Sequence, residues 1–221
     1  MGTDAFTSYD VKNTRMGKGG APTKEQYAAL ENAYNYFNKA LFKSELPPVL
    51  ITISRRSRSK GYYLPKSWFN ESCPDIAQIN INPVILHSGP KTAFGVLVHE
   101  MVHHQQFLIE NTIHGGYHTR KFAELMAGAG LACSSTGEPG GMQTGRHMSH
   151  YVLPGGAFET AFEKIPEHCL VPFKPHDTQI NYKNANKNKT TYFCPKCKLL
   201  AWAKPGANFV CGSCSLHMET I

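Results

Sequence analysis

Apolar residues at steps of three and four positions predict a helix near the start of the chain. From 27 to 41 they form one helical face, made of Tyr27, Leu30, Tyr34, Phe37 and Leu41. Thr23 and Gln26 have the spacing of a capping box, in which two side chains satisfy the first backbone N–H groups. Pro47-Pro48 ends this unit. Residues 1–22 are polar and Gly-rich, which predicts a disordered segment.

Short apolar runs separated by turns come next. The segments 49–53, 61–64 and 78–82 predict buried strands, and Pro83 closes the last of them. Longer periodic segments predict helices at 91–110 and about 119–129, and a brief helix at 157–165. Residues 130–156 are rich in Gly, Ser and Thr, which predicts mostly loop. A helix, three strands and then helices indicate an α+β fold.

The C-terminal part of the chain has a different composition. Residues 166–191 are polar, with Pro, Asn and Lys prominent, and residues 192–221 contain paired cysteines. We therefore expect four parts: a disordered segment 1–22, an α+β domain 23–165, a basic polar linker 166–191 and a small metal module 192–221.

The composition excludes two classes of protein. Of the 221 residues, 41% are hydrophobic and 18% are charged, which suits neither a disordered chain nor a membrane protein. No stretch approaches the ~20 apolar residues of a membrane span, and the N-terminus lacks the apolar core of a signal peptide. We expect a cytoplasmic protein with no membrane partner, and the sequence predicts no oligomeric state. The net charge of +7 suits a polyanionic partner.

The strongest chemical signal is an HExxH motif, His99-Glu100-Met101-Val102-His103. Residues four apart on a helix share a face, so His99 and His103 could bind one Zn²⁺. Zinc lowers the pKa of a bound water, and Glu100 could take its proton as general base.

A catalytic zinc needs a third protein ligand and one open position. The metzincin spacing requires Gly at 106 and His at 109, and the chain has Gln106 and Ile109, which excludes that class. By residue type, the third ligand could be Glu124, in a thermolysin-like arrangement. His114 and His118, in the loop that enters the next helix, also qualify.

The loop after the motif resembles that of the SprT-like metalloproteases, a family that includes the eukaryotic protease Spartan. In the family pattern a Gly-rich loop presents a third His, and a Phe follows four residues later. Here His118 lies 15 residues after His103 and is followed by Phe122. Thr119 departs from the pattern, since the family usually has Gly there. The resemblance extends over about 24–165 and again over the C-terminal cysteines, through segments such as YFNKALFKSELPPVLITIS, GYY and ININP.

The resemblance implies a zincin-like metalloprotease domain with a small antiparallel sheet and an HExxH helix. It implies that His99, His103 and His118 bind the catalytic zinc and that Glu100 is the base. It also implies that the strand 78–82 is the edge that pairs with an extended substrate. On this interpretation His114 is the alternative third ligand, and Glu124 lies on the surface or beside the ligands.

Other polar residues near the motif have less defined roles. His104 is about 100° around the helix from its ligand neighbour, so we expect it to pack or to be solvated. We expect His147 and His150 to be solvated in the Gly-rich loop, although His150 could line the cleft. Tyr117 and Tyr151 could stabilise an oxyanion, but packing is the simpler expectation for both.

The cysteines predict a second metal site. Two CxxC pairs are separated by 13 residues, close to the zinc-ribbon spacing, and comprise Cys194, Cys197, Cys211 and Cys214. Four thiolates give a closed tetrahedral structural site, and metal binding would supply most of the folding free energy of so small a module. The other three cysteines are scattered, so a disulfide framework is not expected. We expect one catalytic and one structural Zn²⁺.

The charge pattern near the C-terminus favours nucleic acid as a partner. Seven lysines against one acid, Asp177, lie between 174 and 204: Lys174, Lys183, Lys187, Lys189, Lys196, Lys198 and Lys204. Aromatic residues are interleaved with them, namely Tyr192, Phe193, Trp202 and Phe209. This pattern suits single-stranded DNA, although a solvated linker and a self-packed ribbon would look similar. The segment 55–60 is a second basic cluster, or a turn of solvated charges.

Together these features predict a zinc endopeptidase that cleaves proteins bound or crosslinked to DNA, since the resemblance implies that DNA binding is coupled to proteolysis. Two alternatives stay open. One is a non-catalytic nucleic-acid adaptor that keeps the zincin fold as a scaffold. The other is a general cytosolic metallopeptidase with no DNA role.

Overall fold

The computed structural model describes residues 21–55, 59–176 and 189–220. The chain divides into two compact units, a larger one that ends at Pro175 and a smaller one that begins at His176. In the described part of the chain, no helix combines the length and the hydrophobicity needed to cross a membrane.

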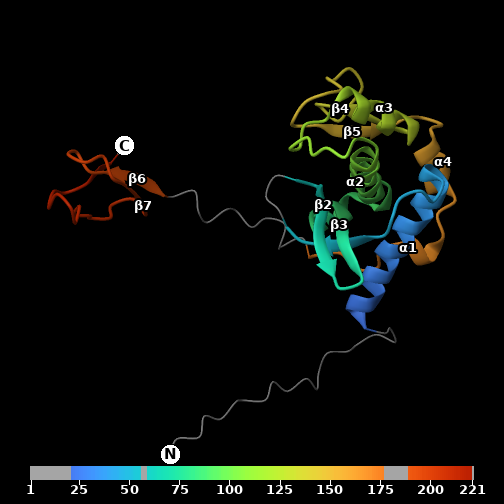
Figure 1. Ribbon diagram of the computed structural model, residues 1–221, viewed down its shortest axis with the longest axis horizontal. Coiled ribbons are helices and arrows are strands. Elements are labelled where there is room, and N and C mark those ends of the chain that lie inside the picture. Colours follow the sequence, from blue (N-terminus) through green and yellow to red (C-terminus); the bar gives the residue numbers. More distant parts are fainter. Residues whose placement is uncertain (1–20, 56–58, 177–188, 221) are drawn as a thin grey trace, which may run out of the picture. The chain divides into compact units, whose positions relative to one another are not determined.

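Helix α2 (Pro90–Glu110) lies at the centre of the larger unit, with strands both above and below it in Figure 1. It begins at Pro90, whose fixed φ suits the first helical turn, and ends before Asn111, which has a left-handed φ of 49°. Its middle is buried on most of its circumference, which suits a helix covered by other elements on several sides. The predicted range 91–110 is confirmed.

Helix α1 (Pro22–Phe42) and helix α4 (Ala157–Glu163) close the core beside α2. The Phe37 ring stacks on that of Phe158 at a centroid distance of 5.6 Å, and it lies 5.7 Å from the Phe94 ring of α2. All three side chains are almost fully buried. The periodic apolar face predicted for the first helix is therefore its core face from Leu30 to Leu41, whereas Tyr27 is exposed.

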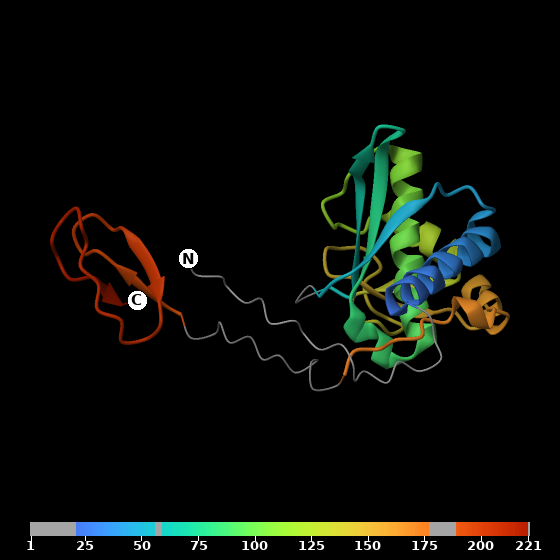
Figure 2. The ribbon, with the colours of Figure 1, turned by 90° about the horizontal axis from the view of Figure 1, so that it is seen from below.

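The three-stranded sheet has the order β1-β3-β2, with β1 (Val49–Ile53), β2 (Gly61–Asn70) and β3 (Cys73–Ile81). Figure 2 shows these strands running beside α2. Strand β2 is antiparallel to β3, but β1 is parallel to β3. The sheet is thus mixed: the expectation of a small antiparallel sheet is correct for β2 and β3 and wrong for β1. The reason is that β3, the second strand of the β2–β3 hairpin, lies between β1 and β2.

The position of β3 overturns a second expectation. A central strand has both backbone edges occupied by its neighbours, so 78–82 cannot be the edge that pairs with substrate. Among the described strands of this sheet, the outer ones are β1 and β2. Ile79 and Ile81 of β3 point into the core, while Asn80 on the other face donates to Thr52 and Ser54.

Two strands lie where the sequence predicted loop. Helix α3 (Arg120–Gly128) is followed by β4 (Leu131–Ser134), which pairs antiparallel with β5 (Ser149–Val152). The prediction of loop at 130–156 is wrong for these segments. Both faces of β4 are buried, so its sequence need not alternate between apolar and polar residues. Four residues are also too few to give a periodic signal.

Both ends of the larger unit differ from expectation. The capping box is wrong, because α1 starts at Pro22 and places Thr23 inside the helix. Gln26 instead donates to the carbonyl of Phe173 and accepts from its N–H. A 3₁₀ helix, Glu167–Cys169, also packs on α1 with Cys169 fully buried. The linker expected from 166 is therefore wrong up to 175, and residues 177–188 lie outside the described ranges.

The smaller unit is a three-stranded antiparallel sheet. Its order is β7-β6-β8, with β6 (Thr190–Phe193), β7 (Leu200–Ala203) and β8 (Glu219–Thr220). Tyr192 is buried at its centre, where its hydroxyl donates to the carbonyl of Lys204 and accepts from the N–H of Ala207. A 3₁₀ helix in the larger unit, Pro83–Ser88, completes the regular elements.

Candidate active site and metal centres

Three histidine side chains converge at the middle of α2. His99 and His103 lie one turn apart on the same helical face, and His118 comes from the loop before α3. The Nε2 atom of His118 is 3.1 Å from that of His99 and 3.2 Å from that of His103. Two nitrogens bound to one tetrahedral zinc at about 2.0–2.1 Å are about 3.3 Å apart. The structure therefore brings together the three predicted ligands in a set that fits zinc.

His118 is oriented by Gly145, a residue that the sequence pattern did not single out. The ring Nδ1–H of His118 donates to the Gly145 carbonyl at 3.1 Å, which leaves Nε2 with a free lone pair. The two backbones also exchange hydrogen bonds of 2.8 and 3.1 Å. Gly145 has a φ of 143°, which side-chain-bearing residues rarely adopt. Only tertiary pairing over 27 residues reveals this role.

The surroundings keep the three rings neutral. Burial lowers the pKa of His103 to about 3, and it lowers the pKa of His99 well below the usual value. Burial also lowers the pKa of His118. The Phe122 ring packs against all three imidazoles, with centroid distances of 4.1–5.1 Å. Neutral imidazoles are the form that binds a metal, so the cluster is ready to act as a donor set.

Glu100 lies on the same helix and is 5% exposed. Burial raises the pKa of its carboxyl to about 8, and a cation nearby would oppose that shift by favouring the carboxylate. Gly61, at the start of β2, approaches it closely: a Cβ there would lie 2.9 Å from Glu100 Oε1 and from the Asn80 carbonyl. A side chain at position 61 would therefore displace the carboxylate or the strand.

The cluster opens into a cleft of about 610 Å³. One wall is the start of β2 and its preceding residues, the floor is α2, and the other walls are the loop 112–118 and residues 146–150. Lys60 reaches across from the first wall, with its Nζ 3.4 Å from Ser149 Oγ. Glu100 is the single acid among the described lining residues, which otherwise include Lys60 and Arg146. Residues 56–58 of the predicted basic cluster lie outside the described ranges.

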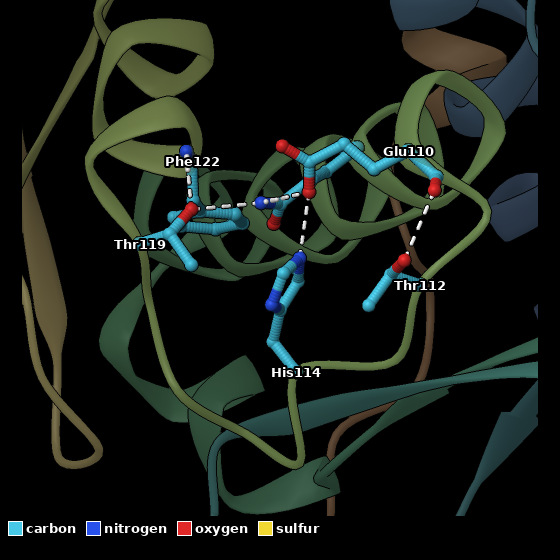
Figure 3. Close-up of polar contacts among 6 residues, drawn as sticks. Glu110, Thr112, His114, Thr119 and Phe122 are labelled. Atoms are coloured by element: carbon cyan, nitrogen blue, oxygen red, sulfur yellow. Dashed lines mark hydrogen bonds and ion pairs between the residues drawn. The ribbon is translucent and has the colours of Figure 1, made fainter.

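Two rival third ligands lie outside the metal cluster. Glu124 is exposed on α3, where its carboxylate lies 3.4 Å from Arg120 Nε. The thermolysin-like arrangement therefore does not fit this geometry. His114 donates through Nε2 to Glu110 Oε2 at 2.6 Å and is held there (Figure 3). Neither side chain belongs to the described cluster of ligand atoms.

Other predicted residues have mixed outcomes. His104 packs in the interior, with Nδ1 3.0 Å from the Tyr63 hydroxyl. His147 and His150 both line the cleft, and the His150 ring lies 5.2 Å from that of His99, so solvation is the wrong expectation for His150. Tyr117 is 44% exposed at the cleft, so packing is the wrong expectation for it. Tyr151 does not line the cleft as described.

The four paired cysteines form a second candidate metal centre, in the smaller unit. The ligand atoms of Cys194, Cys197, Cys211 and Cys214 lie within 4.8 Å of one another. The Sγ atoms of Cys197 and Cys211 are 3.6 Å apart, close to the ~3.8 Å expected for thiolates on a tetrahedral zinc with Zn–S near 2.3 Å. The predicted cysteine set is thus brought together.

The two CxxC turns have the same backbone pattern. In each, the first cysteine donates to the carbonyl five residues on, Leu199 or Leu216, and accepts from the N–H four residues on. The latter residue, Lys198 or Ser215, has a left-handed φ. The backbone N–H of Cys197 hydrogen-bonds the Cys194 sulfur and lowers the pKa of that thiol. Such donors stabilise thiolates, the form that binds zinc.

The aromatic residues of this unit differ in accessibility. Tyr192 is buried and packs edge-on against Phe209 at 5.2 Å, so it belongs to the interior. Trp202 on β7 is 61% exposed. Lys198 Nζ lies 5.4 Å above the Phe193 ring. The sequence could not separate these roles, because all four aromatics lie in similar short segments.

Comparison with known proteins assigns the larger unit to a family. An uncharacterized protein from the mucB 3' region of Salmonella typhimurium is 54% identical over 41 residues, which are 19% of this chain. The chain spans 55% of the length of that relative. No solved structure matches. The sequence profile of the SprT-like family matches residues 30–139, which include α2 and the three histidines. The chain therefore contains a SprT-like domain and belongs, over residues 30–139, to the SprT-like family.

Proposed function

We propose that the larger unit is a zinc-dependent endopeptidase with a zincin-like fold. The observation that carries the proposal is the convergence of three neutral imidazole nitrogens beside a buried carboxylate, at the floor of an open cleft. Membership of the SprT-like family supports it, since it suggests a metallopeptidase-like domain.

Different residues of the chain would bind the metal, transfer the proton and bind the peptide. When bound, zinc acts as a Lewis acid toward the scissile carbonyl and makes water a nucleophile near neutral pH. His99, His103 and His118 would hold it. Glu100 would accept the proton of the attacking water and pass it to the leaving amine. Strand β2 is an outer strand among those described and lines the cleft, so an extended peptide could pair with its outer edge.

The direct test is zinc-dependent cleavage of an unstructured protein such as casein by the full chain. We expect two zinc ions per chain, one for each cluster. A chelator should remove the histidine-bound ion and activity together, and added zinc should restore both. Full zinc occupancy without cleavage of any protein, with or without DNA, would favour the non-catalytic adaptor.

We further propose that the smaller unit is a zinc ribbon that binds single-stranded DNA and so directs cleavage to proteins bound or crosslinked to it. Trp202 supports this, because an exposed aromatic face is what an unpaired base stacks on. The described lysines of the unit, Lys189, Lys196, Lys198 and Lys204, would contact phosphates. Such binding should weaken steeply between ~50 and ~200 mM salt as counterions are released.

The DNA proposal predicts that Trp202→Ala weakens single-stranded DNA binding by roughly 1–3 kcal/mol, the usual contribution of one stacked base. Leu200→Ala is the matched control, because it removes another exposed apolar side chain from β7. Fluorescence anisotropy with an oligonucleotide measures both variants, and metal content verifies that each keeps the ribbon zinc.

A second readout separates the DNA-directed protease from a general peptidase. Single-stranded DNA should accelerate cleavage of a DNA-bound protein by the wild type, and Trp202→Ala should reduce that acceleration without slowing casein cleavage. Equal rates for both proteins on DNA-bound substrate would favour a general peptidase with no DNA role.

A further inference from the structure

A partly buried hydrogen-bond network connects α2 to both sides of the His118 loop (Figure 3). Gln106 Nε2 donates to Glu110 Oε2 at 2.9 Å and to Thr119 Oγ1 at 2.8 Å. The same Glu110 oxygen accepts from His114 Nε2 at 2.6 Å. Thr119 Oγ1 also accepts from the backbone N–H of Phe122 and thereby caps α3. The Gln106 amide and the Glu110 carboxylate on α2 therefore bind His114 and Thr119, on either side of His118.

Gln106 lines the cleft, and its amide has the donors that this network needs. Its side chain is 2% exposed, and its amide nitrogen has two hydrogens, which the two contacts use. A buried amide that loses such partners is costly, so the network defines one arrangement of its members. The Thr119 hydroxyl is the group that receives one of these two hydrogen bonds.

The loop that carries the third ligand lacks regular structure of its own. Asn111, Gly115 and Gly116 have positive φ values, and no described helix or strand lies between α2 and α3. His114 lies four residues before His118, and Thr119 lies directly after it. Holding these two positions restricts the loop on both sides of the ligand. The Gly145 pairing restricts His118 itself.

We propose that Gln106, Glu110 and Thr119 are positioning residues that preset His118 for metal binding. The inference rests on the proposed zinc site. The helix that carries His99 and His103 also carries Gln106 and Glu110. The network therefore fixes the position of His118 relative to His99 and His103. An ordered loop loses less conformational freedom when the metal binds, and the zinc affinity of the histidine site rises accordingly.

The first test replaces Gln106 with Leu in the full chain, which keeps the side-chain size and removes the hydrogen bonds. Gln105→Leu is the matched control, since Gln105 is half-buried on the same helix and has no side-chain hydrogen bond in the described structure. Zinc affinity is measured by competition with a chromophoric chelator. Gln106→Leu should weaken the histidine site about tenfold, the low end of the effect of losing a ligand's direct partner, because Gln106 acts on His118 through Thr119 and Glu110. The four-cysteine site and the Gln105 control should keep wild-type affinity.

A second pair of variants keeps the test decisive if Gln106→Leu does not fold. Thr119→Val removes the hydroxyl at nearly constant volume, and Thr119→Ser retains it. The network predicts weaker zinc binding for Val and recovery for Ser, whereas a role in packing alone predicts the reverse, because Ser lacks the methyl group. Thermal unfolding of the metal-free proteins verifies that both are folded.

The outcomes also separate this inference from the proposed function. If both Gln106→Leu and Thr119→Val bind zinc like the wild type while His118→Ala does not, the positioning role is overturned and the zinc site stands. If His118→Ala also keeps wild-type zinc affinity, the zinc site itself is wrong, and the positioning role falls with it.

Discussion

Glu100→Gln is expected to abolish peptide hydrolysis while the chain retains both zinc ions. Glutamine has nearly the same size as glutamate but cannot accept the proton of an attacking water. Loss of a general base typically slows a reaction ~10²–10⁴-fold. The side chain is 5% exposed and adjoins Gly61, so an isosteric replacement should preserve the packing. The measurement is kcat on an unstructured protein, together with metal content.

The matched control for this change is Glu124→Gln, which removes one carboxylate charge from the exposed face of α3. It should leave kcat close to the wild-type value. The base assignment is wrong if Glu100→Gln retains wild-type kcat. If it instead loses the histidine-bound zinc, Glu100 acts as a metal ligand or supports one.

His118→Ala is expected to empty the histidine site. The change removes one of three converging imidazoles, and the remaining two both come from α2. The loss of affinity should exceed the ~10–100-fold that follows the loss of an outer hydrogen-bond partner. Atomic absorption should find one zinc per chain instead of two, because the cysteine cluster lies in the other unit.

Glu124→Ala provides the opposite case, since a thermolysin-like site would need that carboxylate as its third ligand. The structure places it beside Arg120 on the surface, so zinc content and activity should remain unchanged. Zinc loss in Glu124→Ala, combined with retention in His118→Ala, would reverse the ligand assignment.

The parts of the site that the sequence predicted depend on local spacing. His99 and His103 lie on one helix, and the helix period alone puts them on the same face. The cysteine set could be predicted for the same reason, since each CxxC pair forms one turn. His118 could not be chosen by spacing, because three candidate residues qualified, and the resemblance to a family decided among them.

The parts that were missed depend on contacts between distant segments. The place of β3 within the sheet follows from which strands pair, and that order is not encoded in the pattern of any single strand. Gln26 has capping-box spacing, yet its partner is Phe173, 147 residues away. Gly145 resembles any loop glycine until it pairs with His118.

The pairing of His118 with Gly145 has a kinetic consequence. Gly145 belongs to the connection between β4 and β5, and neighbouring residues of that connection, Arg146 and Met148, line the cleft. The proposed third ligand and a cleft wall are therefore joined by backbone hydrogen bonds. A movement of residues 145–148 would therefore also move His118. The dissociation rate of a bound zinc ion would then depend on the conformation of this cleft wall.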